Sequence, residues 1–206
     1  MKFAILLCFV CAAAFALGPV EQEPDHHAGF HNDALYILEP LFPPGHTTRE
    51  HEHHYDGASV CIAGSVMRAK PTGGDWGAPR QLCQPGDVNI NEATGKHTSH
   101  TVENVGTVTT HLSLIENLRE GGWTTFAPVT ADGLIVIKES RAFRAYRVEP
   151  GSAAHSHPVQ TVVVLISGRA STDGKELDRD GASVYNPAGQ SHRVTGEGKV
   201  VEDDVR

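Results

Sequence analysis

The chain has 206 residues, 39% of them hydrophobic and 20% charged, so it has enough apolar side chains to form a core and global disorder is excluded. Its 17 Lys and Arg residues against 25 Asp and Glu residues give a net charge of -8, which excludes the broad basic surface that nucleic-acid binding needs. The chain also has 13 His residues, several of them clustered, together with 21 Gly and 12 Pro residues. This combination predicts short strands joined by tight turns, with imidazoles gathered at a site.

The first residues have the pattern of a targeting segment. Lys2 precedes an apolar run over residues 3–17, and Ala14 and Ala16 form an A-x-A arrangement. The pattern predicts a signal peptide over residues 1–18, cleaved near Ala16 or Gly18. The run is too short to span a bilayer, although an uncleaved N-terminal anchor is the alternative interpretation. We therefore expect a secreted or periplasmic protein without a membrane partner.

Two cysteines remain after such a cleavage, Cys61 and Cys83. In an exported protein two cysteines are more often paired than free, so a disulfide is expected, with two buried thiols as the alternative. Neither cysteine belongs to a C-x-x-C pair, which excludes a zinc ribbon and a thioredoxin motif.

The rest of the chain predicts strands. Residues 19–33 are polar and predict a mobile arm with solvated His26, His27 and His31, weak metal binding being the alternative. From Ala34 onward, short apolar runs bounded by Gly, Pro, Asn and Asp predict an all-β chain. These runs cover residues 35–38, 59–66, 107–115, 134–137, 145–148 and 161–166. The charged segment 116–122 ends in Gly-Gly and predicts a boundary between two similar halves.

The two halves repeat a histidine pattern. Each has an H-x-H pair followed by a more distant His: His51, His53 and then His97 or His100 in the first half, and His155, His157 and His192 in the second. Residues i and i+2 of a strand point to the same face, so both imidazoles of an H-x-H pair can reach one ion. The third His closes the site if the two strands lie side by side.

These residues resemble the two motifs of the cupin superfamily, which run Gly, H-x-H, Glu, Gly and then Gly, Pro-x-Gly, His, Asn. The first motif is matched at the family spacing by Gly45, His51, His53 and Gly64, and the second by Gly181, Pro187, Gly189 and His192. The resemblance implies two tandem cupin barrels (double-stranded β-helix or jelly roll), over residues 34–118 and 123–206, each with a metal inside.

The sequence departs from the motif at the carboxylate. Gly57 and Thr161 stand where the family has Glu, so neither half has an acid at that position. His100 is preferred to His97 as a ligand, because Asn104 follows it as Asn follows the His of the family motif. The resemblance thus implies two three-His metal sites, formed by His51, His53, His100 and by His155, His157, His192.

A three-His site suits a divalent transition metal; iron is favoured here, with copper, nickel, zinc and manganese left open. Without a carboxylate the ion keeps its full positive charge, which favours an anionic or chelating small-molecule substrate. Cupins that lack the Glu resemble thiol and diketone dioxygenases, so we expect a dioxygenase-like, metal-dependent oxidoreductase. The alternatives are a non-catalytic cupin that binds a ligand, sequesters metal or serves as a storage protein, and a cupin isomerase or lyase.

The sequence favours the first half if only one half binds metal, because its H-x-H pair has the family spacing and Gly57 leaves space at the ion. The oligomeric state is open, a homo-oligomer paired through edge strands being one arrangement.

Other residues are weaker candidates for a role at the metal sites, and two pairs of them have two interpretations each. Tyr55 and Asp56 orient a ligand imidazole or form a turn. Arg144 and Arg147 hold a substrate carboxylate or are surface charges. His54 is expected to be exposed. His111, on an apolar strand, is expected to be a core histidine.

Overall fold

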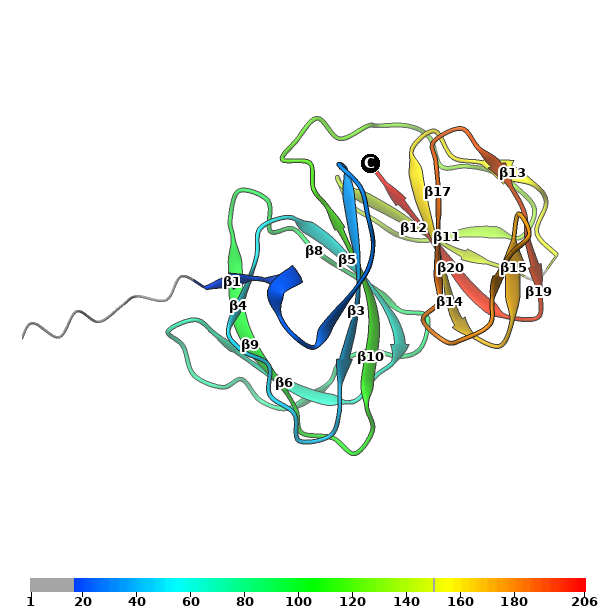
Figure 1. The fold of residues 1–206 in the computed structure, drawn as a ribbon. Coiled ribbons are helices and arrows are strands. Elements are labelled where there is room, and N and C mark those ends of the chain that lie inside the picture. Colours follow the sequence, from blue (N-terminus) through cyan, green and yellow to red (C-terminus); the bar gives the residue numbers. More distant parts are fainter. Residues whose placement is uncertain (1–16, 150) are drawn as a thin grey trace, which may run out of the picture.

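The computed structural model describes residues 17–149 and 151–206, and Figure 1 shows that these residues form two curled β units. Most of the predicted signal peptide, together with Cys8 and Cys11, lies outside the described residues. Among the described residues, no helix is long and apolar enough to cross a membrane. The all-β prediction is confirmed, since strands alternate with turns and one short 3-10 helix throughout both units.

The N-terminal unit, residues 18–117, consists of two five-stranded sheets with the orders β1-β4-β9-β6-β7 and β2-β3-β10-β5-β8. Its elements are β1 (Gly18–Pro19), η1 (Val20–Gln22), β2 (His26–His31), β3 (Leu35–Phe42), β4 (His51–His53), β5 (Asp56–Ala63), β6 (Val66–Pro71), β7 (Arg80–Gln81), β8 (Val88–Asn91), β9 (Thr98–Asn104) and β10 (Thr110–Asn117). The H-x-H pair occupies the whole of β4, next to β9.

The C-terminal unit, residues 134–205, has a five-stranded sheet of order β11-β12-β20-β14-β17, and a two-stranded and a three-stranded sheet lie on the side of the unit away from the N-terminal unit (Figure 1). Its strands are β11 (Leu134–Glu139), β12 (Phe143–Val148), β13 (His155–Ser156), β14 (Gln160–Ser167), β15 (Ala170–Thr172), β16 (Lys175–Leu177), β17 (Ser183–Asn186), β18 (Ser191–His192), β19 (Val194–Gly196) and β20 (Lys199–Val205). Within residues 17–149 and 151–206, no ladder joins a strand of one unit to a strand of the other.

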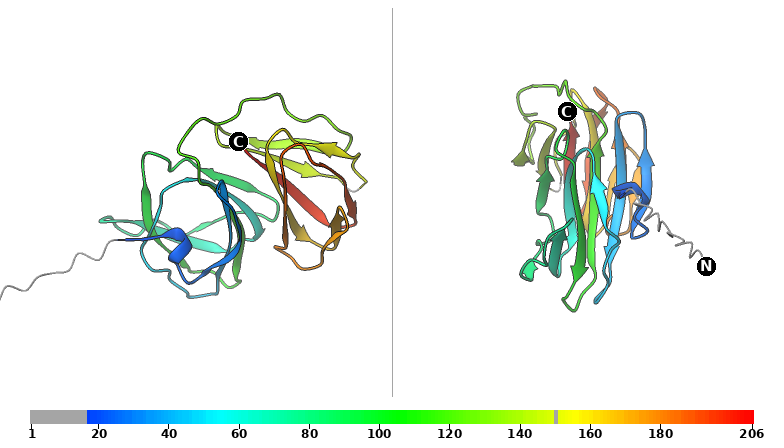
Figure 2. Two further views of the ribbon diagram at one scale, coloured as in Figure 1. Left: turned by 45° about the horizontal axis from the view of Figure 1, so that its top comes forward. Right: turned by 90° about the vertical axis from the view of Figure 1, so that its left-hand side faces the viewer.

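The two units lie side by side and share an apolar core (Figure 2). Alternate residues of β3 and β5, such as Ile37 and Val60, face alternate residues of β14 and β20, such as Val164 and Val201. This explains why the run is apolar at every position from 162 to 166: β14 is buried on both faces, one against its own unit and one against the neighbouring sheet.

The N-terminal arm is ordered, so the prediction of a mobile arm is wrong. β2 pairs antiparallel with β3, and β1 pairs parallel with β4. His27 and His31 are exposed as expected, but His26 is only 6% exposed and faces the interior. Backbone pairing with an existing sheet edge supplies the order that the polar side chains of this segment do not predict.

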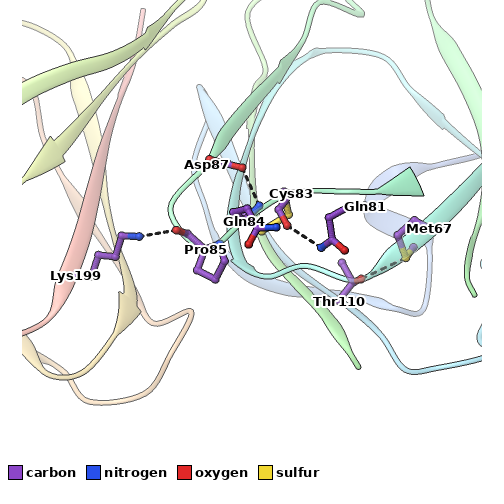
Figure 3. Close-up of a disulfide and its surroundings, with 9 residues drawn as sticks. Met67, Gln81, Cys83, Gln84, Pro85, Asp87, Thr110 and Lys199 are labelled. Atoms are coloured by element: carbon purple, nitrogen blue, oxygen red, sulfur yellow. Dashed lines mark hydrogen bonds between the residues drawn. A yellow bond between two sulfur atoms is a disulfide. The ribbon is translucent and has the colours of Figure 1, made fainter. Parts of the chain in front are cut away.

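The expected disulfide is present. Cys61 of β5 is bonded to Cys83, just after β7, with their Cα atoms 6.2 Å apart (Figure 3). The bond therefore ties the segment that follows β6 and β7 to the sheet at the centre of the molecule. Nearby, Lys199 of the C-terminal unit donates a hydrogen bond to the carbonyl oxygen of Pro85.

Replacing both Cys61 and Cys83 by Ser is expected to lower the free energy of unfolding by about 3 kcal/mol, because the bond closes a loop of 22 residues in the unfolded chain. Urea unfolding of the mature protein with and without the two substitutions measures this difference. Thiol titration of the unreduced wild type should find no free thiol, and two reactive thiols would contradict the bond.

An ion pair between a buried carboxylate and a partly exposed arginine also joins the units. Asp56, at the start of β5, has a fully buried side chain that accepts hydrogen bonds from Arg141 Nε at 2.8 Å and Arg141 Nη2 at 3.0 Å. The backbone N–H of Thr94 donates a further hydrogen bond to the same carboxylate. Burial alone raises the pKa of Asp56, but the hydrogen bonds from Arg141 and Thr94 outweigh it and the pKa is lowered. Asp56 therefore holds the two units together and does not orient a metal ligand.

The lowered pKa of Asp56 predicts a pH dependence of stability. Its contribution is fully present above the unfolded value, about 3.9, and is lost as the pH falls through the lower folded pKa. We expect Asp56→Asn to cost about 2 kcal/mol at pH 7 and the difference from wild type to shrink below pH 4. Urea midpoints measured from pH 7 to pH 2.5 test this, and a difference that does not depend on pH would contradict it.

Candidate metal centres

Three histidines converge inside the N-terminal unit, as the sequence predicts. His51 and His53 project from β4, and His100 lies directly opposite His51 on β9. Their ring centroids are 4.8 to 5.3 Å apart, and one nitrogen of each ring lies within 4.8 Å of the others. His97, the alternative third histidine, does not belong to this group and lies near Glu52 and His54 instead. The strand alternation of β4 and its pairing with β9 thus produce the expected trio.

The protonation states of His51 and His100 suit metal binding. Nδ1 of His51 lies 3.0 Å from the backbone oxygen of Arg49, which it reaches as a donor, leaving Nε2 with a free lone pair. Burial lowers the pKa of His51 to about 4 and that of His100 to about 3, so both rings are neutral at pH 7. Neutral imidazoles with converging lone pairs are the form that binds divalent transition metals.

The trio opens onto a cavity of about 410 Å³. Most of its wall is apolar, with Phe42, Met67, Leu112 and Leu114 among the lining residues. Two cations, Arg68 and Arg80, also line it. Arg68 is paired with Glu103, whereas Arg80 has no ion-pair partner among the described residues. The cavity therefore suits a small molecule with an apolar body and a negative charge.

A fourth imidazole, His26 of β2, lines the same cavity. Its ring centroid lies 5.1 Å from that of His51 and 5.5 Å from that of Phe42, and its Nδ1 is buried without a hydrogen-bond partner in the described chain. Burial and the neighbouring imidazoles lower its pKa to about 2. His26 was expected to be solvated, with weak metal binding as the alternative, because its position in the cavity depends on how the arm pairs with β3.

A second cluster lies inside the C-terminal unit, where His155, His157 and His192 also converge. His155 of β13 lies opposite His192 of β18, repeating the pairing of His51 with His100. His155 Nδ1 lies 2.9 Å from the backbone oxygen of Ala153, as His51 does from that of Arg49.

The expectation that this second site lacks a carboxylate is wrong. Glu202 of β20 lies among the three imidazoles, with its oxygens 2.9 Å from His155, 3.1 Å from His157 and 3.2 Å from His192. The carboxylate comes from the last strand, not from the position of Thr161. A signal was present: Glu202, Asp203 and Asp204 form an acidic run with Val on both sides, and such a run is unusual in a buried strand.

Further carboxylates control the charge of the second cluster. His157 Nδ1 lies 2.6 Å from Asp204 Oδ1, which also accepts a hydrogen bond from the Thr161 hydroxyl. Burial lowers the pKa of His157, but Asp204 and Glu202 outweigh burial and raise it to about 9. The pKa of Glu202 is lowered despite its complete burial, because three histidines bond to it. The second cluster is therefore closed and internally paired.

The strand registers show how the two clusters correspond. Glu116 lies opposite Gly57 in the N-terminal unit, as Asp204 lies opposite Thr161 in the C-terminal unit. Glu116 is 3.7 Å from His53 Nδ1, the counterpart of the contact between Asp204 and His157. Two residues earlier, the strand β10 has Leu114 opposite Ser59, where β20 has Glu202 opposite Val163. Leu114 thus occupies the place of the second cluster's carboxylate.

The weaker candidates have structural roles. Arg144 is 2% exposed and donates to Glu139 and to the backbone oxygen of Phe126, and Arg147 pairs with Glu149 at the surface, so neither reaches the N-terminal cavity. His111 is half-buried and paired with Glu39. Asn104, used above to select His100, donates to the backbone oxygens of Phe42 and Val108.

No family model and no curated protein matches the sequence. Several solved structures resemble it across most of their length. A cupin 2 conserved barrel domain protein from Leptotrichia buccalis has 14% identity and a TM-score of 0.52, covering 87% of this chain and 88% of that one. The pirin YhhW from Escherichia coli, in complex with nickel(II), has 15% identity and a TM-score of 0.60, with 87% and 90% covered. A salicylate 1,2-dioxygenase from Pseudaminobacter salicylatoxidans has 12% identity and a TM-score of 0.61, with 88% and 77% covered. The chain therefore has the fold of the cupin superfamily.

Proposed function

We propose that this chain is a metal-dependent oxidoreductase of the dioxygenase type, and that its active site is the cavity of the N-terminal unit. One observation carries the proposal: three converging imidazoles, grouped without a carboxylate, open onto a cavity with an apolar wall and with Arg80, which has no ion-pair partner among the described residues. The site would hold a divalent transition metal, iron being favoured. One similar structure is by name a dioxygenase and another is a nickel complex, which is consistent with this proposal.

The residues of the cavity have separable roles in this proposal. His51, His53 and His100 would hold the metal, which when bound would bring dioxygen and substrate together and accept negative charge. Arg80 attracts the anionic group of the substrate, and Phe42 and Leu112 exclude water around its apolar body. Both oxygen atoms of dioxygen enter the product in such a reaction, so no external reductant is needed.

The second cluster favours a different use of metal. Glu202 fills the space between its imidazoles, and none of these four side chains lines the cavity of the N-terminal unit. We propose that an ion there would serve stability, not turnover. If the ions at both clusters served only stability, the protein would be a non-catalytic metal-binding protein, which is the alternative function.

The test is metal analysis of the purified mature protein, combined with oxygen-uptake measurements on a panel of small aromatic, thiol and diketone acids. Substrate-dependent uptake that is lost in His53→Ala but kept in His155→Ala supports the proposal. Arg80→Gln should raise KM for the anionic substrate with a smaller effect on kcat. Metal without any oxygen uptake across the panel would select the non-catalytic alternative.

We also propose that the protein is exported, with the segment before Gly18 removed. The apolar run at residues 3–17 and the disulfide between Cys61 and Cys83 support this. N-terminal sequencing of protein recovered outside the cytoplasm tests the cleavage, and a retained Met1 would contradict it.

A further inference from the structure

The outer face of β4 carries a third group of metal-ligating side chains. Because side chains alternate along a strand, His51 and His53 point into the unit while Glu52, between them, points out. His54 follows on the same outer side, and His97 approaches from the turn before β9. His54 was expected to be exposed, and His100 was preferred to His97 as an interior ligand, so the interior sites use none of the side chains of this group.

The three side chains already have nearly the separations that a metal ion needs. Glu52 Oε2 lies 2.7 Å from His54 Nε2, and Glu52 Oε1 lies 3.7 Å from His97 Nδ1. One ligand atom of each side chain lies within 4.8 Å of the others. Zinc bonds of about 2.0 to 2.1 Å at a tetrahedral angle place two ligand atoms roughly 3.3 Å apart, between these two separations.

His97 is held in place by an uncommon backbone conformation. Its φ angle of 50° is in the left-handed region, which few residues other than Gly adopt and where Asn, Asp and His are the most frequent exceptions. The N–H of His97 donates to the backbone oxygen of Ala93 at 2.9 Å, which closes the turn. In this position the His97 ring stacks on that of His54, with centroids 4.7 Å apart and planes inclined by 25°. The turn thus directs a second imidazole toward the Glu52 carboxylate.

The group lies at a hollow with room for additional ligands. His54 and His97 line a surface pocket of about 280 Å³, together with Tyr55, Thr94, Gly95 and Glu120. The side chains of Glu52, His54 and His97 are 24%, 36% and 54% exposed, so an ion from solvent can reach them without opening the fold. This distinguishes the group from both interior clusters.

We propose that Glu52, His54 and His97 form a surface site for a divalent transition metal of the zinc and copper type. Two imidazoles and one carboxylate supply three ligands, and water in the pocket completes the coordination, as in open zinc sites. The site is separate from the interior clusters, and its existence does not depend on the proposed oxidoreductase activity.

The test is a titration of the mature protein with zinc chloride by isothermal calorimetry. The metal content of the interior sites is measured first and must be the same in wild type and in each variant. Wild type should take up one further equivalent. His54→Ala and His97→Asn should each weaken that step by at least roughly tenfold, since even residues that only orient a ligand have effects of this size. Asn is chosen at position 97 because it tolerates the left-handed backbone and lacks the imidazole.

The matched control is His27→Ala, which removes an exposed histidine of the same unit that lies outside the group. It should bind the further zinc ion as wild type does. An equal affinity in wild type, His54→Ala and His97→Asn would overturn the proposal, as would an equal loss in the His27 control, which would indicate dispersed surface binding. Unchanged interior metal content in all variants shows that the outcome concerns this face alone.

Discussion

Replacing Glu202 by Leu in metal-free protein is expected to lower the free energy of unfolding by about 3 to 5 kcal/mol, the range for a buried charge cluster that loses one partner. Glu202 is fully buried and is within hydrogen-bond distance of all three histidines of the second cluster. Without it, the charge on His157 is opposed only by Asp204, and the Nε2 atoms of His155 and His192 lose their partner. The C-terminal unit then contains buried polar atoms that have no hydrogen-bond partner.

Urea unfolding in the presence of a chelator measures this effect. Glu176→Leu is the matched control, because Glu176 is an exposed carboxylate on β16 of the same unit and its replacement should change stability by no more than about 0.5 kcal/mol. Metal-loaded wild type should be more stable than the chelated protein, since an ion that binds only the folded chain adds to its stability. A Glu202→Leu variant no less stable than the Glu176 control would mean that the carboxylate does not bond to the histidines.

The sequence predicts the strands well because the local pattern carries that information. An H-x-H pair with alternating faces and apolar runs bounded by Gly and Pro are sufficient to place β4, β5 and β14 in a β fold. The sequence does not predict the pairing of β2 with β3, because the side chains of β2 are polar or small except for Phe30 and show no alternation of apolar and polar residues. Its order comes from backbone hydrogen bonds to a sheet edge formed by other residues.

The metal clusters were predicted in part for a related reason. The histidines lie at spacings that can be read from the sequence, whereas the carboxylates depend on the register between distant strands. Glu202 meets His155 across 47 residues of sequence, and a shift of one residue would turn it toward the neighbouring unit. Asp203 shows the alternative: on the other face of β20 it is fully buried, and burial raises its pKa to about 8. Local patterns do not distinguish these two acids.

The register also locates the carboxylate that the N-terminal cluster lacks. The sequence places the missing acid at Gly57, but a Cβ at Gly57 would meet the Leu114 side chain at 3.2 Å, so a longer side chain there must first displace Leu114. Leu114 itself stands at the position that Glu202 occupies in the second cluster, and it lines the cavity beside the three imidazoles. Leu114→Glu is therefore the direct way to convert the first cluster into the second.

Leu114→Glu is expected to bind metal more tightly and to reduce oxygen-dependent turnover at least roughly tenfold, equivalent to about 1.4 kcal/mol or more in activation free energy. The new carboxylate adds a ligand and a negative charge, and it competes with an anionic substrate for the open side of the site. In chelated protein the variant should be less stable than wild type, because the buried carboxylate then faces neutral imidazoles. Added metal should restore its stability.

Leu114→Gln is the control for this experiment, because it places a polar group of similar size at the same position without the charge. It should share the loss of stability in chelator but not the full gain in metal retention. Retention is measured as the rate at which a chelator removes metal, and turnover as oxygen uptake. Tighter metal binding in Leu114→Glu with unchanged oxygen uptake would separate the two properties, and it would show that substrate does not meet the metal on the side of the cavity where Leu114 lies.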